Sequence, residues 1–254
     1  MPGGRPDGLL SPLQLYTFDV NGFLLLERAL DPSDVARLRD VIAAQDLSAP
    51  GEPIQTQRFG QAGAMFEWDP AFVDLIDHPW VLATLRSLIG PHVRLDHAYG
   101  IIMKPGDSGL GLHGPAEPFD PAQYYLSRMG AVRSGLLAFA WSLTDGRPGQ
   151  GGFGCIPGSH RASLPLPESA ESLVVEVAQP EGSLLVFTEG LVHCTIPWEG
   201  EATRLVLMMK YSPGNSAWDP RPAAPDSTVD AMDDARRLFF QPPSVGGHRP
   251  VFEE

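Results

Sequence analysis

Residues 134–144 read SGLLAFAWSLT, an apolar run that ends at Asp145. Its length and its mixture of aromatic and aliphatic side chains are typical of a buried β-strand. Similar runs, bounded by Gly, Pro and Asp clusters, lie on both sides of it: VRLDHAYGIIM at 93–103, SLVVEV at 172–177, GSLLVFT at 182–188 and TRLVLMMKYS at 203–212. Because no helical pattern separates these runs, they favour a sandwich, barrel or jelly roll over a sheet of alternating strands and helices.

Helices are predicted only outside this strand-rich region. Asp31-Pro32-Ser33-Asp34 is a capped helix start followed by apolar residues at helical spacing. A second helix is predicted after Asp77-His78-Pro79, with its end at Gly90-Pro91. A short helix is also expected near Val229–Phe240.

The chain is expected to form a single domain. Its 254 residues show no internal repeat and no separate second domain. The predicted organisation is a flexible lead at 1–15, the strand-rich body, and a Pro- and Asp-rich C-terminal extension at 214–254.

The composition excludes several classes of protein. The formal net charge is −13 and the Lys and Arg residues are scattered, so neither nucleic acid nor an anionic membrane is an expected partner. No apolar run is long enough to cross a bilayer. The opening MPGGRPDGLLSPLQ lacks the charged start and apolar core of a secretory signal, and the cysteines are only Cys155 and Cys194. These features predict a cytoplasmic protein with reduced thiols.

Two histidines stand in a context that suggests metal binding. His113 ends the Gly-rich stretch GDSGLGLHG directly after a strand, and His193 follows the strand GSLLVFT and a turn at Gly190. Arg204 comes eleven residues after His193 and opens the last strong strand. Histidine is the most frequent metal ligand in proteins, but a lone histidine is weak evidence, so the argument depends on this spacing.

The order of several short motifs around these residues resembles the phytanoyl-CoA dioxygenase family of Fe(II)- and 2-oxoglutarate-dependent oxygenases. The motifs are MKPG at 103–106, AWSLTD at 140–145, GGFGCIPGSH at 151–160, LLVFTEGLVHCTIPW at 184–198 and TRLVLMMKYSPG at 203–214. Each motif alone is weak, but their order and spacing match over residues 16–214. The resemblance implies a mainly β fold with flanking helices, a cupin-like double-stranded β-helix or jelly roll.

The resemblance also implies roles for individual residues. His113 and His193 would bind Fe(II), and Arg204 would pair with the distal carboxylate of 2-oxoglutarate, a task that suits a planar guanidinium. Thr195 and Trp141 match positions that line the cosubstrate pocket in relatives. Two imidazoles and a carboxylate on one face of iron leave room for 2-oxoglutarate and oxygen. The expected partners are therefore molecular oxygen and a small organic molecule whose C–H bond is oxidised, most simply by hydroxylation.

The sequence departs from the family pattern at the iron-binding carboxylate. Relatives carry His-x-Asp, whose first and third residues share one face of a strand, whereas residues 113–115 read His-Gly-Pro. Glu189 is the preferred replacement, because the glycine after it permits a turn that brings its α-carbon within about 6 Å of that of His193. Glu117, which lies between prolines, and Asp96 are weaker candidates.

Two alternatives remain open. In resembling halogenases the loss of the carboxylate opens a position for chloride, although the replacing residue there is Gly or Ala rather than Pro. The third reading is a non-catalytic small-molecule-binding protein on the same scaffold. The spacing of His113, His193 and Arg204 speaks against that reading, since a binding module does not need it.

The remaining expectations concern the surroundings of the site. Strand alternation should turn Cys194 to the face opposite His193, where it would be buried and inert. His160 of the PGSH loop should shape that loop without binding metal. The expected pocket walls are segments 51–70, 114–133 and 214–250, with Phe66, Trp68, Tyr124, Tyr125 and Trp218 as candidate lining.

Overall fold

The computed structural model describes residues 8–47, 57–114, 120–128 and 130–252. The strands are β1 Phe23–Leu26, β2 Gln57–Phe59, β3 Val93–Met103, β4 Leu110–His113, β5 Tyr125–Arg128, β6 Ala131–Ser134, β7 Leu137–Ser142, β8 Gly152–Cys155, β9 Val175–Glu176, β10 Leu184–Thr188, β11 His193–Ile196 and β12 Arg204–Pro213. A six-stranded sheet has the order β1-β10-β7-β12-β3-β2, a four-stranded sheet the order β4-β11-β8-β9, and β5 pairs with β6. The strand pairs in the described part of the chain are antiparallel.

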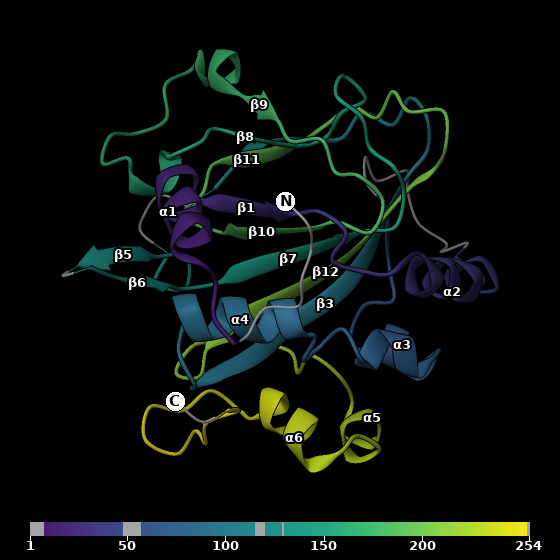
Figure 1. Cartoon of the computed structure of the whole chain (residues 1–254), viewed down its shortest axis with the longest axis vertical. Helices are drawn as coiled ribbons and strands as arrows, with labels where there is room; N and C mark the ends of the chain where they lie inside the picture. Colours follow the sequence, from purple (N-terminus) through teal and green to yellow (C-terminus); the bar gives the residue numbers. More distant parts are fainter. Residues whose placement is uncertain (1–7, 48–56, 115–119, 129, 253–254) are drawn as a thin grey trace.

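Helices and short turns surround the sheets (Figure 1). They are α1 Pro12–Asn21, α2 Pro32–Ala43, α3 Pro70–Val73, α4 Pro79–Leu88, α5 Asp226–Asp230 and α6 Asp234–Arg237, with short 3₁₀ turns η1 Ala64–Glu67, η2 Ser159–Arg161, η3 Ala170–Leu173 and η4 Leu238–Phe240. Figure 1 shows α4 lying across the large sheet, while the four-stranded sheet lies beyond β1 and β10. The prediction of a mainly β chain with flanking helices is confirmed.

Strand alternation divides the interior into two cores. On β12, Leu207 and Met209 point into the larger core beneath the helices, whereas Val206 and Met208 belong to a smaller cluster between the two sheets. The same separation holds along the other central strands, because successive side chains of a strand point to opposite faces. The smaller cluster therefore lines the space between the six-stranded and the four-stranded sheet.

The two predicted helices are confirmed, and both begin at a proline after the predicted cap. α2 starts at Pro32 and buries Val35, Leu38 and Ile42. α4 starts at Pro79, and its N-cap residue His78 accepts a hydrogen bond from the Trp80 backbone N–H. Proline at the first helical position loses no hydrogen bond, which explains why this sequence signal is accurate.

The predicted flexible lead is too long. Ser11 and Gln14 form a reciprocal capping box, with the Gln14 side chain accepting from the Ser11 N–H at 2.8 Å, so that α1 begins at Pro12. Phe18 on this helix is fully buried. A capping box and one aromatic anchor are sufficient to order these residues against the large sheet.

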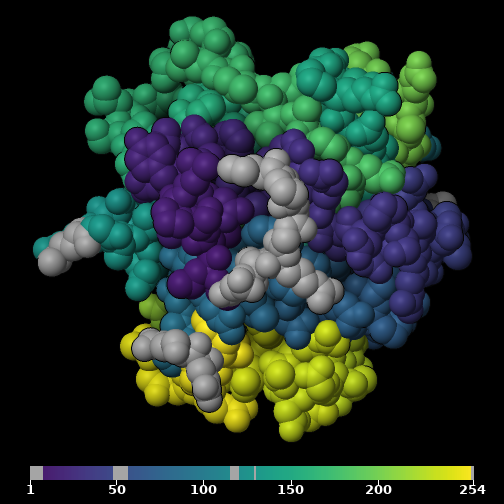
Figure 2. All heavy atoms as spheres, viewed as in Figure 1, coloured from purple at the N-terminus to yellow at the C-terminus, as the bar shows by residue number. Residues whose placement is uncertain are grey.

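The single helix predicted near residues 229–240 is also wrong in detail. The chain forms α5, α6 and η4 in succession, because Asp233 caps a new helix by accepting a hydrogen bond from the Arg236 N–H at 3.0 Å. These turns and the following residues lie at one end of the molecule (Figure 2), where the Val251 N–H donates to the Pro91 carbonyl at 2.9 Å. Among the described residues no helix is long and apolar enough to cross a membrane.

Candidate metal and cosubstrate site

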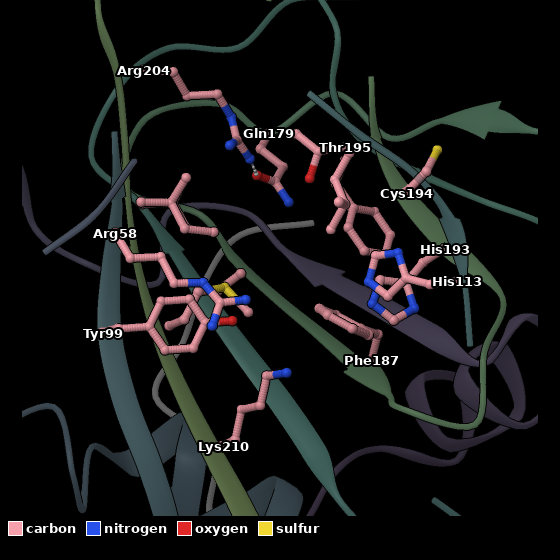
Figure 3. A pocket seen from close by; sticks show the side chains of 16 residues that line it. Arg58, Tyr99, His113, Gln179, Phe187, His193, Cys194, Thr195, Arg204 and Lys210 are labelled. Carbon is pink, nitrogen blue, oxygen red and sulfur yellow. Dashed lines mark hydrogen bonds between the residues drawn. The ribbon is translucent and has the colours of Figure 1, made fainter. Parts of the chain in front are cut away.

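His113 and His193 lie side by side on neighbouring strands of the small sheet. They are directly paired in the β4–β11 register, and their ring centroids are 4.2 Å apart. Residues opposed in an antiparallel pair project from the same face, so both imidazoles point toward the space between the sheets (Figure 3). His193 is buried, while His113 is exposed. The structure thus brings together the two predicted metal ligands.

The hydrogen bonds of both imidazoles suit metal binding through Nε2. His113 Nδ1 lies 2.9 Å from the Gly111 carbonyl, and His193 Nδ1 lies 2.7 Å from the Leu191 carbonyl. A carbonyl only accepts, so each Nδ1 carries the proton and each Nε2 keeps a lone pair for a cation. Burial lowers the pKa of His193 to about 4, which keeps this imidazole neutral. The pair fits a divalent transition metal.

Arg204 forms the opposite end of the cavity. The guanidinium is buried, its Nη2 donates to Gln179 Oε1 at 3.0 Å, and burial lowers its pKa to about 10. Within the described segments no carboxylate forms an ion pair with it. Gln179 Nε2 is also buried and finds no acceptor in that part of the chain. A buried cation beside an unsatisfied amide donor fits the distal carboxylate of 2-oxoglutarate.

Glycine at residue 152 makes room for this arginine. A β-carbon built on Gly152 would lie 2.9 Å from Arg204 Nε, and the residue has a φ of +93°. Any larger side chain would therefore meet the guanidinium and require a rarely adopted backbone conformation. The GGFG motif of β8 consequently contributes to the cosubstrate end of the cavity.

Glu189, the predicted third ligand, is buried next to the histidines but is engaged elsewhere. Its Oε1 lies 2.8 Å from Lys210 Nζ. Burial opposes ionisation of Glu189, yet the charge of Lys210 outweighs it and lowers the pKa of the carboxyl. No group of three or more His, Cys, Asp or Glu side chains is gathered for a metal in the described residues. The role of Glu189 as a ligand stays a prediction.

The other acidic candidates fare differently. Asp96 is fully buried and accepts hydrogen bonds from Arg94 Nη1 at 3.0 Å, Ser212 Oγ at 2.8 Å and the backbone N–H of Trp218 at 2.8 Å, with His97 Nδ1 a further 2.7 Å contact. Its lone pairs are taken, so it has none to offer a metal. Glu117 lies outside the described residues.

The two predicted cosubstrate-pocket residues separate. Thr195 lines the cavity together with the two histidines and Arg204. Trp141 does not: it packs in the larger core, 4.9 Å from the His78 ring, whereas Ala140 faces the cavity. The physical reason is strand parity, because adjacent residues of β7 point to opposite faces.

Cys194 is buried and borders the cavity, and His160 is half-buried in the loop beside it. In Figure 3 the Cys194 sulfur points away from the imidazoles, and burial raises the pKa of its thiol. Both cysteines are free and buried. His160 is packed 4.5 Å from the Tyr125 ring, and burial lowers its pKa to about 4. His160 thus has a structural position beside the site.

Most of the predicted substrate-lining aromatics pack elsewhere. Phe66 and Trp68 join the larger core, and Tyr125 donates a hydrogen bond to Asp19 at 2.6 Å. Tyr124 does not line this cavity, and Trp218 lines a neighbouring pocket.

Several residues that line the cavity were not predicted from the sequence. The additional polar and aromatic lining residues are Arg58, Tyr99, Phe153, Gln179, Phe187 and Lys210. Lys210 could have been predicted, because it lies six residues after Arg204 on one strand and therefore shares its face. Gln179 and Arg58 belong to no motif in the sequence.

Comparison with known proteins identifies relatives of the chain. The family described as phytanoyl-CoA dioxygenase (PhyH) matches residues 18–206. Ectoine dioxygenase of Nocardia farcinica (strain IFM 10152) is 30% identical over 159 residues, which are 60% of this chain and 52% of that protein. The chain thus spans about half the length of the curated relative it matches.

The fold of this chain resembles those of several solved structures. HygX from Streptomyces hygroscopicus, crystallised with nickel and 2-oxoglutarate bound, is 26% identical with a TM-score of 0.71, over 83% of this chain and 90% of HygX. The 2-oxoglutarate-dependent (alpha-ketoglutarate-dependent) carbocyclase SnoK from nogalamycin biosynthesis has a TM-score of 0.65 at 16% identity, over 98% of this chain and 99% of SnoK. At that identity the likeness concerns the fold alone.

Proposed function

Because the chain belongs to the phytanoyl-CoA dioxygenase family, we propose that it oxidises a C–H bond of a small organic molecule, by hydroxylation, with Fe(II) and 2-oxoglutarate. The family match confirms the predicted family. The proposed enzyme class and cofactors are supported by that family and by the structure of HygX with nickel and 2-oxoglutarate bound. The reaction type and the residue roles are our proposal. We also propose that the two facing sheets constitute a double-stranded β-helix, or jelly roll.

One observation carries the proposal: two imidazoles with free Nε2 atoms lie across one cavity from a buried arginine without a carboxylate partner in the described residues. In this assignment His113 and His193 hold the iron. Arg204 and Gln179 Nε2 hold the distal carboxylate of 2-oxoglutarate, and Thr195 lines the space between. Bound iron, with 2-oxoglutarate and oxygen, would supply the oxidising power that the side chains lack.

The chain's own contribution is orientation and exclusion of water. The Gly111 and Leu191 carbonyls fix the rings of His113 and His193, so each imidazole meets a metal without reorganisation. Phe153 and Phe187 pack at 5.8 Å and 4.9 Å from the His193 ring and form an apolar wall beside it. An apolar wall keeps water from the reacting C–H bond and strengthens the electrostatic contacts within the cavity.

Glu189 is our candidate for the third ligand. A rotation of the Glu189 side chain would break its contact with Lys210 and turn the carboxylate toward a metal held by the two imidazoles. Lys210 would then remain close enough to balance the charge of the carboxylate. If Glu189 remains paired with Lys210, iron would be held by the two histidines alone. That arrangement favours a second candidate function, halogenation, since chloride could take the ligand position.

Succinate release from 2-oxoglutarate tests the proposal. We expect release that requires Fe(II) and is abolished by His113→Ala or His193→Ala. His92→Ala is the matched control, because His92 is exposed, contacts the His248 carbonyl and does not line the cavity. Release without Fe(II), or full activity of His193→Ala, would refute the assignment. Chlorinated product that depends on chloride would favour halogenation, and absence of both turnover and metal binding would favour a non-catalytic binding protein.

A further inference from the structure

The cavity has cationic side chains at both ends. Arg204 and Lys210 lie on the same face of β12, six residues and thus about 20 Å apart along the strand. In Figure 3 Arg204 extends toward Gln179 near the top of the view, whereas Arg58, Tyr99 and Lys210 lie below it, toward the other end of the cavity. If 2-oxoglutarate occupies the Arg204 end, the substrate must use the end near Arg58 and Lys210.

A second pocket lies next to that end of the cavity. The cavity around the histidines measures about 90 Å³, and a neighbouring pocket measures about 250 Å³. Small-molecule sites usually occupy about 300–1,000 Å³, so neither space suffices alone. Arg58 and Tyr99 line both of them. A substrate whose reacting carbon lies near the histidines would therefore extend past Arg58 and Tyr99 into the outer pocket.

Aromatic rings form one wall of the outer pocket. The His97 ring stacks between Tyr99 and Trp218, with centroid separations of 5.8 Å and 5.5 Å. Asp96 fixes this wall, because it accepts from the His97 side chain and from the backbone N–H groups of Trp218 and Asp219. The wall is thus preorganised to receive the apolar part of a ligand.

Apart from Arg204, which is assigned to the cosubstrate, Arg58 differs from the other Lys and Arg side chains that line the two pockets. Lys210 is paired with Glu189 at 2.8 Å and Arg221 with Asp219 at 3.0 Å. The described residues give Arg58 no such carboxylate. Its guanidinium instead lies 4.3 Å from the centroid of the Tyr99 ring. Stacking on a buried ring holds the guanidinium plane while leaving its N–H edge open to a ligand.

We propose that Arg58 determines specificity by binding a carboxylate of the substrate at the junction of the two pockets. The inference rests on the proposed function and adds the substrate class: an organic acid whose apolar part lies against Tyr99 and Trp218. An open guanidinium edge matches a planar carboxylate in a bidentate manner. The net charge of −13 makes the protein repel anions in general, so a selective cation at the mouth is needed to admit one.

The test uses protein loaded with Ni(II) and saturating 2-oxoglutarate, so that the Arg204 end is filled. The probes are 3-phenylpropanoate and its neutral counterpart 3-phenylpropanamide, titrated calorimetrically. We expect wild type to bind the acid about tenfold more tightly than the amide, and Arg58→Gln to lose this preference. Arg58→Lys should retain part of it, because charge remains while the planar fork is lost.

Arg221→Gln is the matched control. Arg221 is an exposed arginine of the same pocket, but Asp219 already pairs with it, so its removal should leave the acid preference intact. Equal binding of acid and amide by wild type, or a preference that survives in Arg58→Gln, would overturn the proposal. So would a weakened affinity of Arg58→Gln for 2-oxoglutarate, which would place Arg58 at the cosubstrate instead.

A separate assay tests the proposed oxygenase function. Fe(II)-dependent conversion of 2-oxoglutarate to succinate, assayed without added acid, reports on the histidines and Arg204 only. Succinate release without acid preference would refute the substrate class and leave the oxygenase intact. Absence of succinate release under all conditions would refute the oxygenase itself.

Discussion

Replacing Arg204 by methionine should stabilise the protein while removing its affinity for 2-oxoglutarate. Arg204 is buried, and within the described segments its polar contacts are the neutral side chains of Gln179 and Met103. A buried cation without a counter-charge costs folding free energy, which the bound carboxylate of 2-oxoglutarate would recover. Methionine occupies similar volume and carries no charge, so the variant isolates this cost.

The magnitude follows from the pKa. Burial lowers the pKa of Arg204 from 12.5 to about 10, and each pKa unit corresponds to about 1.36 kcal/mol. The folded-state pKa is the lower one, so the penalty is fully present below pH 10 and amounts to about 3 kcal/mol at pH 7. Losing the hydrogen bond to Gln179 costs about 1 kcal/mol of stability and offsets part of this gain. The net gain is about 2 kcal/mol, or about 4–8 °C in Tm for a chain of this size.

Arg94→Met is the matched control for the stability measurement. Arg94 is equally buried, but its Nη1 lies 3.0 Å from Asp96 Oδ2, so its removal leaves an uncompensated carboxylate and should cost about 3–5 kcal/mol. Thermal unfolding measures both variants, and calorimetry with Ni(II)-loaded protein should show 2-oxoglutarate affinity at least about 100-fold weaker in Arg204→Met. If Arg204→Met lowers Tm as much as Arg94→Met does, the guanidinium has a counter-charge and the reasoning fails.

Three further predictions concern single residues. Gln179→Leu should weaken 2-oxoglutarate binding about tenfold, through loss of the Nε2 donor, with Ni(II) affinity unchanged in the same calorimetric titration. Glu189→Gln should weaken Fe(II) binding at least about tenfold in a competitive chelator assay, and an unchanged affinity would discard Glu189 as a ligand. Burial lowers the pKa of His160 to about 4, below its unfolded value, so its contribution to stability is complete above about pH 6.5 and is lost as pH falls toward 4. Denaturant unfolding should therefore show that the unfolding free energy of the wild type falls by up to about 3 kcal/mol more than that of His160→Gln between these pH values. Identical pH profiles would contradict the assignment.

The strands β3, β7, β10 and β12 and the helices α2 and α4 could be predicted because their signals are local, whereas β1, β2, β5, β6 and α1 were not predicted. Apolar runs bounded by Gly and Pro mark the strands, and proline after an acidic or polar cap marks α2 and α4. The C-terminal turns could not be predicted as such, since one side-chain cap at Asp233 decides where a helix is interrupted. Competition between a cap and helix continuation is too close for sequence periodicity to resolve.

The site was predictable only where spacing along a strand or a family motif supplied the information. His113, His193 and Arg204 were found in this way. Trp141 was misplaced because every residue of β7 is buried, so no polar side chain in that strand marks which face meets the cavity. Gln179 lies between strands β9 and β10, where its contact with Arg204 depends on tertiary packing alone.

The charges around the cavity explain why the absence of a carboxylate at Pro115 need not remove the metal site. Lys210 and Glu189 neutralise one another at 2.8 Å beside the histidines, so a carboxylate remains within reach of the imidazoles although the His-x-Asp position has none. A divalent metal and Arg204 together would carry three positive charges, and 2-oxoglutarate supplies two negative ones. The surplus positive charge and the open guanidinium of Arg58 then act in the same direction. An acidic substrate would complete the charge balance of the filled cavity, whereas a cationic one would meet repulsion from the metal and from Arg58.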